Sequence, residues 1–201
     1  MRHIFIGDIH GCASELDALI RMIRYQKGTD RLYMTGDLFT KGPDPLEVWK
    51  TVGSTGANVV LGNHDAELMV RMQARQDGAD ESDLDPSHIH TLDQLKPVAD
   101  GILLWLEFLP LSIREPEFTL VHAGVNPERG LERTRRQEFL AIRTWPPVDG
   151  IEGPRWHDHY TPPDSRPLIF GHDAPGGLVV KREDDNHPPY VVGLDTGCVY
   201  G

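Results

Sequence analysis

Short apolar runs alternate with amphipathic stretches in the N-terminal part of the chain. The run HIFI leads through the loop GDIHG into a stretch with leucine and isoleucine at helical spacing, and the same order returns twice. A proline opens the second helical stretch and a glycine closes it. Strand-to-helix steps of this kind predict a parallel sheet with right-handed crossovers. We predict strands at 3–6, 31–36 and 58–61 and helices at 13–25, 45–56 and 62–76.

The rest of the chain has a less regular pattern that ends in β-like sequence. Pro97 is expected to break a helical region, and the last two strands are expected to form a hairpin. The pattern predicts an acidic loop at 79–88, one or two helices at 91–109, a strand and loop at 117–125, a helix at 128–145, a proline-rich surface loop at 146–163 and strands at 167–172, 177–183 and 189–195.

Composition narrows the class of protein. A chain of 201 residues, 39% hydrophobic and 25% charged, can build one domain with a substantial core, so we expect a single domain over 1–201. The sequence has no apolar run long enough for a bilayer and no secretory signal at its start, which predicts a cytoplasmic protein without a membrane partner. A net charge of −11 argues against a nucleic-acid surface, which needs clustered lysine and arginine.

Side chains that can bind metal stand at the ends of the predicted strands. In open α/β sheets the ligand site lies at the carboxyl ends of the strands. A single Asp there usually caps a helix and a single His is usually structural, but a full set on one edge predicts a metal site. The set comprises Asp8, His10, Asp37, Asn63, His64, His122 and His172.

The spacing of these residues suits two divalent ions that share a carboxylate. Asp8 and His10 can face one ion, and Asp37 can bridge to the second. Two such ions lower the pKa of a shared water and clamp phosphate oxygens, which predicts phosphoester hydrolysis. Oxygen and nitrogen ligands without thiolate suit Mn²⁺, Fe or Zn²⁺ more than Cu(I), and ligand type does not choose among them. The second ion would be completed by Asn63, His122 and His172.

The motifs GDIHG, GDLFTKGPD, GNHD, VHAGV, FGHDA and LDTGCVYG, in this order, resemble those of the calcineurin-like metallophosphoesterases. The resemblance implies a four-layer α/β/β/α sandwich with a dinuclear metal site at the strand ends. It makes the six residues above ligands of two divalent ions, with Mn²⁺ expected and Fe, Zn²⁺, Co²⁺ and Mg²⁺ as alternatives. It also makes His64 the general acid that protonates the leaving oxygen.

Within this family the chain resembles the phosphoprotein phosphatase branch, because Ala174 stands where nucleases and related phosphodiesterases carry a second histidine. Bacterial symmetrical diadenosine tetraphosphatases are the most similar group. The resemblance implies hydrolysis of a dinucleoside polyphosphate by a metal-bridging water. A serine/threonine protein phosphatase that acts on a phosphoprotein is the alternative, and a catalytically silent metal- or phosphate-binding module is disfavoured because every ligand type is present.

Two positions depart from the commonest form of the second motif, where the protein phosphatases carry Asp and Arg. Thr40 is expected to offer His64 at most a neutral hydrogen bond, and Lys41 retains positive charge but loses the planar fork that grips two phosphate oxygens. Arg143 is the predicted second phosphate clamp.

Overall fold

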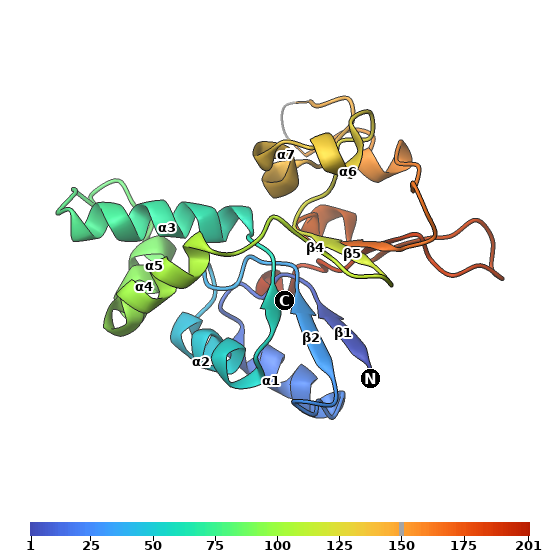
Figure 1. Cartoon of the computed structure of the whole chain (residues 1–201). Coiled ribbons are helices and arrows are strands. Elements are labelled where there is room, and N and C mark those ends of the chain that lie inside the picture. The colour runs from blue at the N-terminus through green and yellow to red at the C-terminus, as the bar shows by residue number, and fades with distance from the viewer. Residues whose placement is uncertain (149–150) are drawn as a thin grey trace.

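Two β-sheets lie face to face at the centre of the computed structural model, which describes residues 1–148 and 151–201 (Figure 1). The first sheet is parallel, with the order β1-β2-β3, and the second has the order β4-β5-β6-β8-β7. The strands are β1 (His3–Ile6), β2 (Arg31–Met34), β3 (Asn58–Val59), β4 (Ser112–Arg114), β5 (Thr119–Val121), β6 (Leu168–Phe170), β7 (Val179–Lys181) and β8 (Val191–Gly193).

The alternation of side chains along the strands creates three apolar layers. In β2, Leu32 and Met34 pack toward the helices of the N-terminal half, whereas Tyr33 packs toward the second sheet. In β6, Ile169 belongs to the layer between the sheets, and Phe170 packs on the opposite side. Because successive side chains of a strand point to opposite faces, each strand contributes to two layers. The result is the predicted α/β/β/α sandwich.

The described residues form seven α-helices around the two sheets (Figure 1). Two of them lie against the first sheet, three pack together at its side and share its apolar core, and the two short ones lie over the second sheet. They are α1 (Ala13–Met22), α2 (Pro45–Thr55), α3 (Asn63–Gln76), α4 (Pro86–Leu95), α5 (Ala99–Glu107), α6 (Gly130–Arg133) and α7 (Arg136–Ala141). Pro97 lies in a short 3₁₀ turn between α4 and α5, which confirms the predicted break.

The structure departs from the predicted elements in four places. Helix α4 begins at Pro86, inside the loop predicted at 79–88, because the Asp85 side chain accepts hydrogen bonds from the N–H groups of Ser87 and His88. Strand β4 was not predicted; it pairs antiparallel with β5. The helix predicted at 128–145 is divided, because Thr134 is extended and its hydroxyl bonds back to the Gly130 carbonyl. The surface loop predicted at 146–163 includes residues 149–150, which lie outside the described part, and it contains a short 3₁₀ turn, Trp156–Asp158, in which Trp156 is buried.

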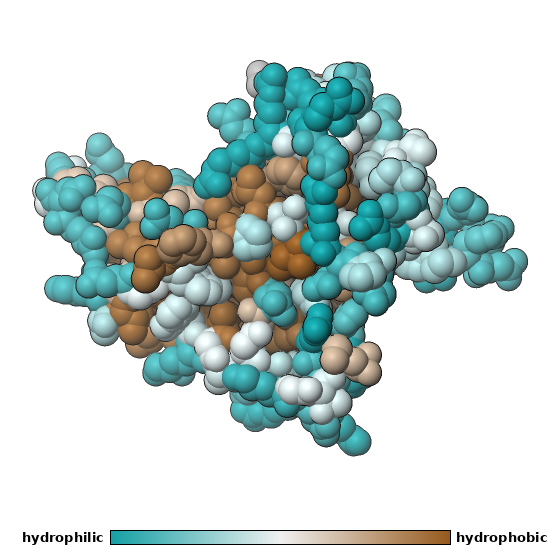
Figure 2. Space-filling model, in the orientation of Figure 1, coloured by the Kyte–Doolittle hydropathy of each residue, from teal (hydrophilic) through white to brown (hydrophobic). Residues whose placement is uncertain are grey.

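Apolar side chains also gather on one outer face, over α3 to α5 (Figure 2). Val70 of α3 and Leu104 of α5 are exposed, as is Phe108 directly after α5. Among the residues that the structure describes, every helix is too short or too polar to cross a membrane.

Candidate metal centre

Three of the predicted ligands lie in loops with left-handed backbone: φ is 47° at His10, 51° at Asp37 and 68° at His172. Such a conformation costs a non-glycine residue about 1–3 kcal/mol and persists where the surrounding structure over-determines it. They lie in the loops that follow β1, β2 and β6. The strained loops thereby aim three side chains into one place.

The Asp37 loop is held by contacts from two other loops. The Asp37 carbonyl accepts hydrogen bonds from the backbone N–H groups of Ile9 (3.2 Å) and His10 (2.8 Å). The Asp65 carboxylate accepts hydrogen bonds from the N–H groups of Asp37 (2.7 Å) and Leu38 (2.9 Å). Asp65 is fully buried in the first turn of α3. This carboxylate therefore fixes the backbone that carries Asp37.

Asp37 lies between two groups of possible metal ligands. One group is formed by His10, Asp37 and His64, and the other by Asp37, His122 and His172. Within each group the ligand atoms lie within 4.8 Å of one another. Oδ2 of Asp37 is 3.7 Å from Nε2 of His10 and 3.6 Å from Nε2 of His122. A carboxylate shared by two groups has the position of a bridging ligand.

In the second group, which contains Asp37, His122 and His172, nitrogen lone pairs are directed toward the centre of the group. His122 donates its Nδ1–H to the Thr35 carbonyl at 2.7 Å, which leaves Nε2 as an acceptor toward the cluster. That Nε2 atom lies 2.9 Å from Oδ1 of Asn63 and 3.2 Å from Nδ1 of His172. An amide oxygen and two imidazole nitrogens thus converge, as metal ligands do.

Burial sets the protonation of these residues. It lowers the pKa of His10 to about 3, with a contribution from Lys41, and lowers the pKa of His122 to about 4. It raises the pKa of Asp37 to about 7. Neutral imidazoles and buried carboxylates are a donor set that fits divalent cations, because metal binding needs unprotonated nitrogen and supplies the positive charge.

Asp8 belongs to neither group, although it is buried in the same loops. Its Oδ1 accepts a hydrogen bond from the Thr35 hydroxyl at 2.7 Å, and its Oδ2 accepts one from the His172 N–H at 3.0 Å. Burial raises its pKa well above the ordinary value, and Asp37 and Asp195 add to the shift. Asp8 therefore holds the His172 backbone while it lies near the other carboxylates.

The predicted catalytic residues surround this cluster. The His64 ring lies 5.1 Å from the His10 ring, centroid to centroid. Nζ of Lys41 is 3.3 Å from Nε2 of His10, and Arg143 donates a hydrogen bond to the His172 carbonyl at 3.0 Å. Thr40 was expected to contact His64, but its hydroxyl lies 3.3 Å from Nδ1 of His10 instead. The threonine that replaces the usual aspartate at this position therefore contacts His10 and not His64.

A cavity of about 500 Å³ opens above these side chains. His10, Asp37, His64 and His172 line it, and Lys41 and Arg143 bring positive charge to it. The C-terminal segment closes one side with Asp195 and Tyr200. This arrangement offers metal-ligating groups and two cations to an anionic molecule.

Comparison with known proteins assigns the fold and the motifs to one family. Residues 1–193 match the family described as Calcineurin-like phosphoesterase. The chain belongs to the calcineurin-like phosphoesterase family. Proteins of this family bind divalent metals, which agrees with the donor set of the cluster. The resemblance inferred from the motifs is confirmed.

Two curated relatives and one solved structure are similar to this chain. The symmetrical bis(5'-nucleosyl)-tetraphosphatase of Psychromonas ingrahamii is 38% identical over 139 residues, which are 67% of this chain and 48% of that protein. That of Klebsiella pneumoniae is 39% identical over 145 residues, 68% of this chain and 48% of that protein. A solved structure of a candidate diadenosine tetraphosphatase has a TM-score of 0.75 at 31% identity and covers 99% of this chain and 85% of its own. The chain spans about half the length of the curated relatives it matches.

The site of this calcineurin-like phosphoesterase also includes residues that the sequence analysis missed. Asp65 supports the Asp37 loop, and Asp195 lines the cavity. Both residues could have been recognised from their positions in the sequence. Asp65 is an acid in the third position of a helix, where it can bond the backbone at the helix start, and Asp195 stands at a strand end like the predicted ligands.

The tryptophan of the segment RWHDHY, residues 155–160, does not line this cavity. Trp156 is buried in the core over the second sheet, and its Nε1–H donates to the Ala123 carbonyl at 3.1 Å. Its apolar ring therefore stabilises packing and is not available to stack on a ligand.

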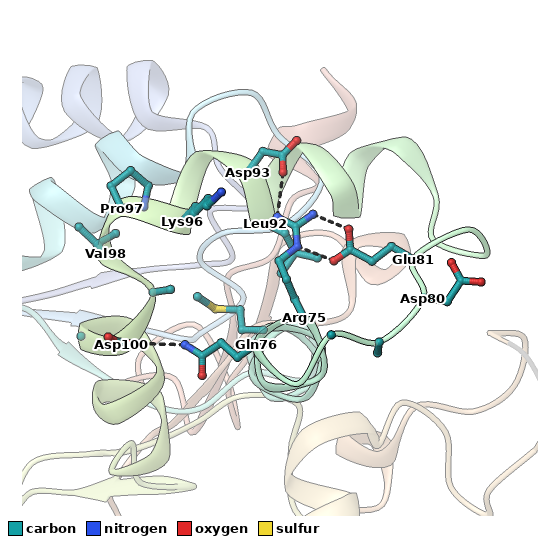
Figure 3. Close-up of a pocket in the computed structure, with 15 residues that line it drawn as sticks. Arg75, Gln76, Asp80, Glu81, Leu92, Asp93, Lys96, Pro97, Val98 and Asp100 are labelled. Carbon is teal, nitrogen blue, oxygen red and sulfur yellow. Dashed lines mark hydrogen bonds and ion pairs between the residues drawn. The ribbon is translucent and has the colours of Figure 1, made fainter.

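A larger hollow, of about 820 Å³, lies between α3, α4 and α5 (Figure 3). Several of its polar side chains pair with one another: Arg75 bridges Glu81 and Asp93, and Gln76 donates to Asp100. The groups that could bind metal in the described residues lie elsewhere, at the smaller cavity. We therefore locate the family's site at the smaller cavity, where potential ligand atoms converge.

Loss of the Asp65 carboxylate is expected to destabilise the fold. In Asp65→Ala the N–H groups of Asp37 and Leu38 lose their acceptor, at a cost of roughly 1–3 kcal/mol for each buried donor left unpaired. Urea denaturation of the metal-free protein at pH 4 measures this loss. Burial and the nearby Asp37 raise the pKa of Asp65 from 3.8 to about 7, so its carboxyl group reduces stability as the pH rises between these values. At pH 4 this proton-linked effect is small and offsets little of the loss.

Asp77→Ala, at the exposed end of the same helix, is the matched control and is expected to change the unfolding free energy by less than about 0.5 kcal/mol. Equal effects of the two substitutions would contradict the support role of Asp65.

Proposed function

We propose that this chain is a dinuclear-metal hydrolase that cleaves dinucleoside tetraphosphates symmetrically into two nucleoside diphosphates. The observation that carries the proposal is the position of the Asp37 carboxylate between two ligand groups at the floor of a cavity with two cations. The choice of substrate rests on the symmetrical tetraphosphatases at 38% and 39% identity.

In this proposal Asp8, His10 and Asp37 would hold one ion, and Asp37, Asn63, His122 and His172 would hold the other. When bound, the ions, with Mn²⁺ as the first choice, would supply an acidified water and neutralise phosphate charge. Residues 1–201 act as a single unit, because His10 and Tyr200 from opposite ends of the chain line the same cavity.

The side chains above the ions handle the phosphates and the proton. Lys41 and Arg143 bind phosphate oxygens, Lys41 as a point charge and Arg143 through its planar fork. His64 donates a proton to the leaving oxygen. Burial lowers the pKa of His64 to about 4, with Lys41 adding to the shift. A polyphosphate bound beside His64 raises this pKa, because negative charge favours the imidazolium form.

Product analysis tests the proposal. The protein loaded with Mn²⁺ and given diadenosine tetraphosphate is expected to release ADP as the only nucleotide product, measured by anion-exchange chromatography. Formation of ATP and AMP in equal amounts would contradict symmetrical cleavage. A higher kcat/KM on a phosphoserine peptide than on the dinucleotide would favour the protein phosphatase alternative. Binding of Mn²⁺ without turnover of either substrate would favour the third alternative, a catalytically silent binding module.

A further inference from the structure

A buried carboxylate next to the cluster is shared by two arginines. Asp173 directly follows His172 and is 4% exposed. Its Oδ2 lies 2.7 Å from Nε of Arg155, and its Oδ1 lies 3.8 Å from Nε of Arg143. The contact with Arg155 is a close ion pair, whereas the contact with Arg143 is an ion pair at longer range. Arg155 is therefore the nearer cationic partner of Asp173.

The two arginines differ in what they can reach. Arg143 lines the cavity of about 500 Å³ that we assign to the substrate, and Arg155 is not among its lining residues. Their backbones are adjacent: Thr144 and Arg155 form an antiparallel bridge, and the Trp156 N–H donates to the Arg143 carbonyl at 3.0 Å. This backbone pairing holds Arg155 beside Arg143 but outside the lining of the cavity.

The charges of the three residues sum to one positive charge. A buried carboxylate needs a cationic partner, because the protein interior solvates an isolated charge poorly. If Arg143 were the partner of Asp173, its guanidinium would be drawn away from a phosphate and its charge would be cancelled. With Arg155 as the partner, the charge of Arg143 remains available to the cavity.

We propose that Arg155 is a positioning residue for substrate binding: it neutralises Asp173 and thereby leaves Arg143 free to bind a phosphate group. The proposal rests on the proposed hydrolase function. It assigns to a residue of the RWHDHY segment a role in affinity for phosphate, exerted through Asp173 and Arg143 without contact between Arg155 and the substrate.

The test compares Arg155→Met, Arg155→Lys and the double variant Arg155→Met/Asp173→Asn in the Mn²⁺-loaded protein. Steady-state kinetics on diadenosine tetraphosphate give KM and kcat, and calorimetric titration gives the Kd for inorganic phosphate. Arg155→Met is expected to raise KM and the phosphate Kd about tenfold, as for loss of one charge-assisted contact, with a smaller change in kcat. Arg155→Lys keeps the charge and is expected to remain within about threefold of the wild type.

The double variant separates electrostatics from packing. If Arg155 acts by neutralising Asp173, removal of the carboxylate restores part of the affinity that Arg155→Met loses. If Arg155 only supports the fold, the double variant binds phosphate no better than the single variant, which would overturn the proposal. Melting curves show whether each variant is folded. If Arg155→Met does not fold, the KM and phosphate Kd of Arg155→Lys test the proposal.

Arg166→Met is the matched control, because Arg166 forms an ion pair with Asp164 at the surface, with 36% of its side chain exposed against 18% for Arg155. It is expected to leave KM and the phosphate Kd unchanged. An inactive wild-type protein would refute the hydrolase function. An active wild type with an unchanged KM and phosphate Kd in Arg155→Met would refute the positioning role alone.

Discussion

Replacement of Asp37 by asparagine is expected to reduce the rate of diadenosine tetraphosphate hydrolysis more than about a hundredfold, the upper range for loss of a residue that only supports a metal ligand. Asp37 is the residue common to both ligand groups, so its loss weakens both proposed ion sites. The fold is expected to survive, because the amide oxygen can still accept the hydrogen bond that the His64 N–H donates to Oδ1.

Two measurements on Asp37→Asn check this result. The first is kcat/KM with Mn²⁺ in excess. The second is the rise in melting temperature on addition of Mn²⁺, which is expected for the wild type because ions bound only to the folded state stabilise it. The rise should shrink in the variant. The metal-free variant is expected to be at least as stable as the wild type at pH 8. Burial raises the pKa of Asp37 from 3.8 to about 7, so this carboxyl group reduces stability as the pH rises between these values, and the full reduction is present at pH 8.

Asp44→Asn is the control, since Asp44 is an exposed carboxylate of the same loop. It is expected to keep both the activity and the thermal response to Mn²⁺. Wild-type activity in Asp37→Asn would remove the shared carboxylate from the mechanism, and an unchanged Mn²⁺ effect on melting would remove it from the metal centre.

Replacement of His64 by glutamine is expected to lower kcat by about 10²–10⁴-fold on diadenosine tetraphosphate, the usual range for loss of a general acid. Metal binding is expected to persist, because the second ligand group does not include His64. The loss should be smaller on p-nitrophenyl phosphate, because its leaving group is stable without a proton. The comparison of kcat for the two substrates therefore reports proton donation.

His64 also belongs to the group of possible metal ligands with His10 and Asp37, so a role as a metal ligand is the alternative to proton donation. If His64 served mainly as a metal ligand, both substrates would lose equal rate and the Mn²⁺ content of the variant would fall. His187→Gln, an exposed histidine far along the chain on the β7–β8 connection, is expected to behave as the wild type.

Part of the fold could be predicted because its signals are local. The strands β1 and β2 and the helices α1 to α3 follow from runs whose period matches their structure. Strand β4 has a weaker pattern, and it becomes a strand through its pairing with β5, in which Arg114 lies opposite Thr119. The break between α6 and α7 depends on the Thr134 hydroxyl, which also accepts a hydrogen bond from the Asn126 N–H. Such pairings depend on three-dimensional neighbours that a local pattern does not contain.

The sequence by itself determined that this protein carries metal-binding side chains and that they lie at the carboxyl ends of the strands. Strand-end Asp8, Asp37, His122 and His172 were visible as ligand types, since the period of the strands and the motif order place them on one side of the sheets. Only the tertiary structure decided how they are used. It places the Asp37 carboxylate between two groups of possible metal ligands and the Thr40 hydroxyl next to the His10 ring. It also brings Asp173 closer to Arg155 than to Arg143. The reason is physical: ligand type and strand position are properties of local sequence, whereas charge partners and burial depend on contacts between segments far apart in the chain.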